Sequence, residues 1–110
     1  MNTFPKTRRL LKKIDYDTVF SQSKKLITPE FIVLYSNNTL GQARLGLAIS
    51  KRKMAKAHER NRIKRLLRET FRTASLPALD IIVLAKRDCS DVQNSIIIAN
   101  LRKAWEKLVA

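Results

Sequence analysis

A continuous apolar run near residue 80 constrains the fold more than any other part of the sequence. The segment Asp80 to Ala85 contains the consecutive apolar side chains of Ile81 to Leu84. Because successive side chains of a strand point to opposite faces, such a strand needs cover on both faces. We therefore expect a central strand between two layers, with a helix-to-strand crossover leading into it.

The segment that precedes this run has the pattern of an amphipathic helix. Between residues 57 and 74, apolar side chains recur at helical spacing and predict one buried stripe, and Leu76-Pro77 is expected to end the helix. The stripe consists of Ile63, Leu66, Leu67, Thr70, Phe71 and Ala74.

Two further helices are expected nearer the ends of the chain. Asp15 is a candidate cap for a short helix, in which Tyr16, Val19 and Phe20 share one face. Ser90 and Gln93 have the spacing of a capping box and predict the start of a final amphipathic helix. Its apolar positions are Ile97, Leu101, Ala104, Trp105 and Leu108.

Three strands are expected between the first helix and the central one. Residues 24–26 are a short edge strand, 31–35 a β-branched and aromatic strand, and 44–50 a strand with large side chains on one face and small ones on the other. Residues 36–42 contain Gly41 and predict a hairpin turn between the second and third strands. The order αβββαβα predicts an α+β sandwich in a single domain, residues 1–110, with 1–10 as a flexible basic arm. The basic residues of segment 1–14 fit a solvated tail and a second phosphate contact equally well.

The charge balance points to a polyanionic partner. The chain has 23 Lys and Arg against 9 Asp and Glu, a formal charge of +14. Such a body is expected to bind a nucleic acid or an anionic membrane. No apolar run approaches the roughly 20 residues of a membrane-spanning helix. One cysteine, Cys89, fits a reducing compartment. We expect a cytoplasmic protein, with a nuclear or organellar site as the lesser alternative.

The cations are concentrated around the predicted helix. Ten basic residues fall between Lys51 and Arg72, opposed by Glu59 and Glu69 alone. Helical geometry places a row opposite the apolar stripe, composed of Asn61, Lys64, Arg65, Arg68 and Arg72. An ordinary solvated face would mix signs to gain ion pairs, so we favour a phosphate-binding surface over a merely solubilising one.

The sequence offers little for catalysis by the chain itself. Its single histidine, His58, allows no histidine pair for a metal or a proton relay, and its single cysteine allows no zinc cluster. We expect His58 to be a surface or helix-start residue, Cys89 to be a packing residue and Trp105 to belong to the core. No catalytic residue and no metal site are predicted.

Several motifs together resemble one family. Residues 44–47 (RLGL), 50–52 (SKR) and 57–66 (AHERNRIKRL) closely resemble the signature of the bacterial ribonuclease P protein component. Segments 9–20, 31–35 and 77–87 are similar to other parts of that family, so the resemblance covers residues from about 8 to 108. Ala55 and His58 stand where many members carry glycine and valine, so the loop before the helix is expected to take a slightly different path.

The resemblance implies a specific function. Family members join a catalytic RNA, one protein to one RNA and with no obligate protein partner, to form an endoribonuclease that removes the 5′ leader of precursor tRNA. The RNA, with Mg²⁺, performs the chemistry, and the protein has no cofactor site of its own. The family fold is similar to a domain of ribosomal protein S5, with a left-handed crossover. The alternatives are a structural RNA-binding protein of ribosomal type and a protein-only nuclease.

The resemblance also assigns residues to two binding surfaces. The leader is expected in a cleft between the sheet and the N-terminal helix, with Tyr16, Phe20 and Tyr35 as candidates. The catalytic RNA is expected on the basic helix and the loop before it. The candidates there are Lys51, Arg52, Lys53, Lys56, Arg60, Asn61, Arg62, Lys64, Arg65, Arg68 and Arg72.

Overall fold

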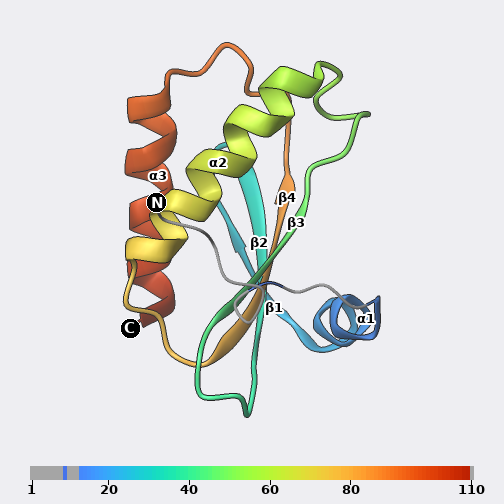
Figure 1. Ribbon diagram of the computed structural model, residues 1–110, viewed down its shortest axis with the longest axis vertical. Coiled ribbons are helices and arrows are strands. Elements are labelled where there is room, and N and C mark those ends of the chain that lie inside the picture. Colours follow the sequence, from blue (N-terminus) through green and yellow to red (C-terminus); the bar gives the residue numbers. More distant parts are fainter. Residues whose placement is uncertain (1–8, 10–12, 110) are drawn as a thin grey trace.

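The helices and strands follow the predicted order. The computed structural model describes residue 9 and residues 13–109. The elements are α1 (Lys13–Gln22), β1 (Lys24–Ile27), β2 (Phe31–Asn37), β3 (Arg44–Ala48), α2 (Ala57–Thr73), β4 (Leu79–Ala85) and α3 (Asn94–Val109). Helices α2 and α3 cover one face of the sheet and α1 covers the other (Figure 1). The predicted basic arm lies outside the described residues except Arg9, which forms a parallel bridge with Leu45.

Strand β4 is the central, doubly covered strand that the apolar run predicts. The sheet order is β1-β2-β4-β3, with β4 antiparallel to β2 and parallel to β3. Ile81 and Val83 are buried beneath α2 and α3, whereas Ile82 is buried against Val19 of α1. Because β3 and β4 are parallel neighbours, α2 is the crossover helix that joins them.

The predicted hairpin between β2 and β3 is wrong, because β4 lies between these two strands. The turn that connects them passes the start of β4. The backbone N–H of Asn38 donates to the Ala78 carbonyl, and its side-chain amide donates to Asp80 at 2.8 Å. Gly41 has φ 78°, a left-handed conformation that glycine adopts without steric cost. The central position gives the most apolar strand cover on both faces and leaves β3 at the edge.

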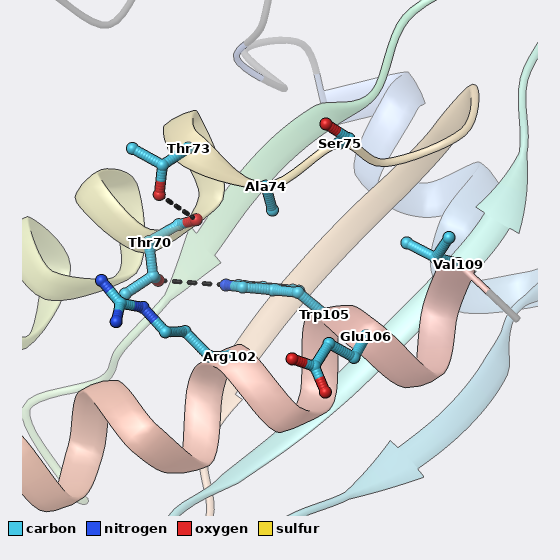
Figure 2. A pocket seen from close by; sticks show the side chains of 8 residues that line it. All are labelled: Thr70, Thr73, Ala74, Ser75, Arg102, Trp105, Glu106 and Val109. Atoms are coloured by element: carbon cyan, nitrogen blue, oxygen red, sulfur yellow. Dashed lines mark hydrogen bonds between the residues drawn. The ribbon is translucent and has the colours of Figure 1, made fainter.

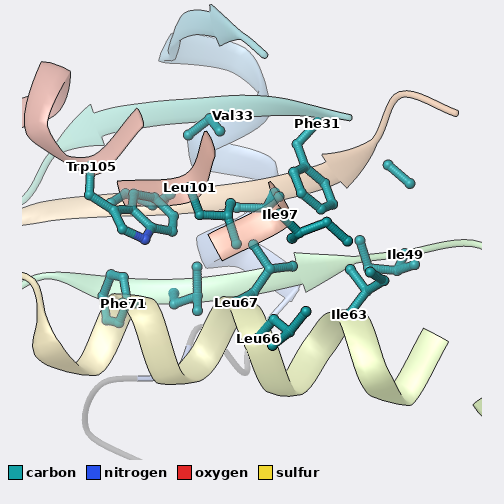
Figure 3. Close-up of a cluster of buried hydrophobic side chains, with 14 of the residues drawn as sticks. Phe31, Val33, Ile49, Ile63, Leu66, Leu67, Phe71, Ile97, Leu101 and Trp105 are labelled. Atoms are coloured by element: carbon teal, nitrogen blue, oxygen red, sulfur yellow. The ribbon is translucent and has the colours of Figure 1, made fainter. Parts of the chain in front are cut away.

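The main core lies between the sheet and the pair α2 and α3 (Figure 3). The predicted stripe of α2 is buried from Ile63 to Phe71, and Ala74 is partly buried. Trp105 is 1% exposed and packs edge-on against Phe71, with ring centroids 5.9 Å apart. Its indole N–H donates to Thr70 Oγ1 at 3.0 Å, so the polar edge of the ring is satisfied within the core. The prediction that Trp105 is a core residue is confirmed.

Two predicted helix caps are wrong. Asp15 lies within the first turn of α1, and its carboxylate faces Arg44 at 3.4 Å. Helix α3 begins at Asn94 rather than directly after Ser90. The Ser90 backbone N–H and hydroxyl both donate to Asp88 Oδ1, so the hydroxyl stabilises a local turn and does not cap α3.

Helix α1 is held to its face of the sheet by a small core and an ion cluster. Val19 packs with Leu34 and Ile82 in this second core. Arg44 donates to both carboxylate oxygens of Asp80, at 2.8 and 2.7 Å, and also approaches Asp15 of α1. The hydrogen bonds with Asp80 raise the pKa of Arg44 above its ordinary value, so the guanidinium stays charged and links helix to sheet.

No helix in the described part of the chain is both long and apolar enough to cross a membrane.

Candidate nucleic-acid interface

The predicted row of cations lies on the outer side of α2. Asn61, Arg65 and Arg68 are exposed, and Lys64 and Arg72 are half-buried. We call these five residues the cationic face. Within the described part of the chain, Arg65 and Arg68 form no hydrogen bond or ion pair, whereas Arg72 pairs with Glu69 at 2.9 Å. The cationic face therefore presents free guanidinium groups, and Arg72 is partly neutralised.

Arg62 points away from this face, toward the segment before α3. Its Nε donates to Glu59 Oε1 at 2.9 Å. Its two Nη atoms donate to the carbonyls of residues 89, 90 and 92 and to Asn94 Oδ1, at 2.6–3.3 Å. An arginine side chain has five N–H donors, and all five are used here. Arg62 consequently has no N–H left for a phosphate and instead fixes the backbone that leads into α3.

Arg60 has a similar structural task on the other side of α2. Its Nη1 donates to the carbonyls of Met54 and Ala55, at 2.9 and 2.8 Å. Met54 is fully buried, and its backbone N–H donates to the Ser50 carbonyl. The loop between β3 and α2 is therefore anchored at its centre. The remaining predicted contacts on this loop, the exposed residues Lys51, Arg52, Lys53 and Lys56, project around that anchor.

The structure separates the three aromatic residues predicted to share a cleft. Tyr16 packs against the small core beneath α1, and Phe20, one turn further along α1, is 48% exposed. Tyr35 packs against the main core on the opposite face of the sheet. Alternation along β2 explains the difference, because Phe31, Val33 and Tyr35 all point toward α2 and α3. The grouping of Tyr35 with Tyr16 and Phe20 is therefore wrong.

Two residues that were not predicted from the sequence project on the same side of the sheet as α1. In the antiparallel pair β1–β2, Lys25 lies opposite Leu34 and Ile27 lies opposite Ile32. Cross-strand partners project on the same side, and Leu34 and Ile32 belong to the α1 side. We call Tyr16, Phe20, Lys25 and Ile27 the α1-side surface. The register of β1 against β2 would have identified Lys25, but register is a relation between two strands and cannot be read from the sequence of one strand.

A hollow of about 400 Å³ lies between the C-terminal ends of α2 and α3 (Figure 2). The residues that line it include Thr70 and Trp105, which are joined by a hydrogen bond, and also Arg102 and Glu106. The opposite charges of these last two residues offset each other. This hollow therefore lacks the uniform positive charge that distinguishes the cationic face.

Cys89 and His58, whose side chains could react chemically, have the environments that the sequence predicts. Cys89 is fully buried in the main core, and this burial raises the pKa of its thiol, which disfavours the nucleophilic thiolate. His58 is exposed in the first turn of α2. Both results confirm the predicted packing and surface roles. Among the described residues, no group of three or more His, Cys, Asp or Glu side chains is arranged to hold a metal ion.

The chain matches known proteins over nearly its whole length. The family model for ribonuclease P matches residues 4–109. The ribonuclease P protein component of Legionella pneumophila (strain Corby) is 56% identical over 110 residues, which cover 100% of this chain and 96% of the relative. That of Escherichia coli O139:H28 is 42% identical over 106 residues, 94% of this chain and 89% of the relative.

The fold agrees with the same assignment. The solved structure of the Staphylococcus aureus RNase P protein has a TM-score of 0.84 and 29% identity, and the match covers 94% of this chain and 98% of that one. The Thermotoga maritima RNase P protein has a TM-score of 0.81 and 27% identity, over 93% of this chain and 98% of that one. With its motifs, its fold and its relatives in agreement, the chain belongs to the ribonuclease P protein component family.

Proposed function

We propose that this chain is the RNA-binding subunit of ribonuclease P and assists a catalytic RNA in removing the 5′ leader of precursor tRNA. The observation that carries the proposal is the cationic face, where Arg65 and Arg68 are exposed and unpaired within the described structure. Like charges on one helix face destabilise it slightly, and a bound polyanion removes that cost. The proposed complex contains one protein and one RNA.

The catalytic RNA is proposed to lie along α2. Each free guanidinium can donate two parallel hydrogen bonds to a phosphate, and Asn61, one turn before Arg65, can donate to or accept from a sugar or base edge. Arg60 and Arg62 act indirectly, because they hold the loops on both sides of the helix. The hydrolytic chemistry is supplied by the RNA with Mg²⁺, and the protein residues bind and orient.

The 5′ leader is proposed to bind the α1-side surface. Single-stranded RNA binds where bases stack on aromatic rings beside a positive charge. Phe20 offers an exposed ring and Lys25 an exposed ammonium group on the same side of the sheet. The proposed site does not include Tyr35, because that side chain packs against the main core on the other face.

Reconstitution tests the proposed function. The purified chain is mixed with a bacterial ribonuclease P RNA and precursor tRNA at low Mg²⁺ and near-physiological salt, and release of the 5′ leader is measured. Stimulation of cleavage is expected. No stimulation would reject the proposal in favour of a structural RNA-binding protein, and cleavage without the RNA would identify a protein-only nuclease.

A pair of double variants separates a specific contact from general charge. Replacing Arg65 and Arg68 with Ala is expected to weaken binding of the catalytic RNA and to leave the fold intact, because neither side chain has a partner in the described structure. The control replaces Lys13 and Arg102, two exposed cations outside the cationic face. Equal losses in the two variants would mean that net charge alone determines binding.

A further inference from the structure

A second group of unpaired cations lies at the other edge of the molecule. Lys103 and Lys107 are exposed on one side of α3, four residues apart and therefore about 6 Å apart along the helix axis. They border a hollow of about 100 Å³ whose opposite wall is the turn from Leu26 to Pro29. Helix α3 and the edge strand β1 thus form one continuous surface.

Strand β1 adds a third cation to this surface. Lys24 lies opposite Tyr35 in the β1–β2 register, and Tyr35 packs on the side of α2 and α3. Lys24 therefore projects toward the α3 side, whereas its neighbour Lys25 projects toward the α1 side. We call Lys24, Lys103 and Lys107 the β1/α3 surface.

No described acidic residue neutralises these three cations. None of them forms an ion pair or a side-chain hydrogen bond in the described structure. The nearest carboxylate in the turn, Glu30, is 3% exposed and accepts a hydrogen bond from Asn100 at 2.9 Å. Glu106, on α3 itself, borders the other hollow, between α2 and α3.

The β1/α3 surface is separate from the cationic face. Strand β1 is one edge of the sheet and α2 contacts the other edge strand, β3, while Lys103 and Lys107 lie on the side of α3 that borders β1. The boundary between α2 and α3 lies between the two groups, and it carries the acidic residues Glu69 and Glu106 together with one exposed cation, Arg102. Side chains of mixed charge therefore separate the two groups of cations.

We propose that the β1/α3 surface binds a second backbone segment of the ribonuclease P RNA, so that the protein bridges two parts of that RNA. This inference rests on the proposed function. The residues that border the hollow are aliphatic, small, polar or cationic, and none is aromatic. The hollow thus has no stacking platform for the bases of a single-stranded leader, and Tyr35, beside Lys24, packs against the main core. The three cations instead match the phosphates of a folded RNA.

The test compares adjacent cations on the same helix. Full-length K103A/K107A is titrated with ribonuclease P RNA at several salt concentrations, beside R102A, which removes an exposed cation from the neighbouring side of α3. Each lost phosphate contact is expected to reduce the slope of log affinity against log salt by about 0.7–0.9, so the double variant loses about twice that value. R102A is expected to keep the wild-type slope. All three positions are exposed, and circular dichroism checks that the fold is retained.

Hydroxyl-radical footprinting of the RNA supplies a second readout. The wild-type chain is expected to protect two separate backbone segments. K103A/K107A should lose one of them, and R65A/R68A should lose the other. If K103A/K107A has the same salt slope and footprint as R102A, the inference is overturned and the proposed function stays intact. The same holds if K103A/K107A shows a binding defect only when precursor tRNA is present. Failure of the wild-type chain to bind this RNA would instead reject the proposed function itself.

Discussion

Replacing Arg62 with Ala is expected to destabilise the fold rather than to remove a phosphate contact. The side chain is 18% exposed, and three of its acceptors are backbone carbonyls of the segment before α3. A buried acceptor left without a donor costs about 1–3 kcal/mol. Asn94 is exposed, so water replaces the hydrogen bond that it loses, whereas Glu59 is only 17% exposed and also loses its ion pair. We therefore expect the free energy of unfolding to fall by about 2–4 kcal/mol.

Urea unfolding followed by circular dichroism measures this loss, and Arg65→Ala is the matched control. Arg65 is the same residue type on the same helix, but it is exposed and without a partner in the described structure. Its replacement is expected to change stability by no more than about 0.5 kcal/mol. In the melting temperature, each 1 kcal/mol corresponds to about 4–8 °C for a domain of slightly smaller size.

The RNA-binding assay should give the opposite ranking. Arg65→Ala is expected to reduce the slope of log affinity against log salt by about 0.7–0.9, because a phosphate contact is lost. At a temperature where it remains folded, Arg62→Ala should keep the wild-type slope, since none of its N–H groups is available to a phosphate. Wild-type stability combined with a reduced slope for Arg62→Ala would refute this reasoning.

Three further predictions concern the two faces of the sheet and the main core. Phe20→Leu should weaken binding of a single-stranded leader by about 1–3 kcal/mol, whereas Tyr35→Leu should leave it unchanged; a fluorescence titration in which Tyr35→Leu shows the larger loss would contradict the assignment of faces. Trp105→Phe removes the hydrogen bond to Thr70 and leaves unfilled space, so thermal unfolding should show a loss of about 1–3 kcal/mol, and an unchanged melting temperature would argue against the buried pair. Cys89 should react with a thiol reagent only after denaturation, because burial raises the pKa of its thiol; rapid labelling of the native protein would be inconsistent with that burial.

Local patterns predicted the helices and strands of this fold well. The order of the strands in the sheet depends on contacts between distant segments, which no local pattern contains. The run Ile81 to Leu84 and the stripe from Ile63 to Phe71 each carry their own periodicity, so their burial was predictable. The turn at residues 36–42 was equally compatible with a hairpin and with a step across a third strand. The second outcome occurs because β4, some 40 residues later in the sequence, gains cover on both faces by lying between β2 and β3.

Local patterns also could not predict where some single side chains of the candidate site lie, because their positions depend on distant segments. Alternation places Tyr35 on the same face as Val33, but which face α1 covers is decided by packing between distant segments. Arg65 and Arg68 were correctly placed because they lie opposite the apolar stripe. Arg62 lies at the margin of the stripe, and four of its five acceptors lie 27 to 32 residues further along the chain. Helical spacing alone could not show that its charge is used inside the protein.

The Arg60-Asn61-Arg62 motif combines two kinds of task within three residues. A helix turns by about 100° per residue, so three successive side chains point in three directions. Arg60 reaches back to the loop before α2, Arg62 reaches the segment before α3, and Asn61 faces outward between them. Lysine carries three donors on a single atom and cannot span carbonyls as widely spaced as those bound by Arg62. The two arginines are therefore required for their geometry, and the charge that we propose to bind RNA is supplied by the next turns of the same helix.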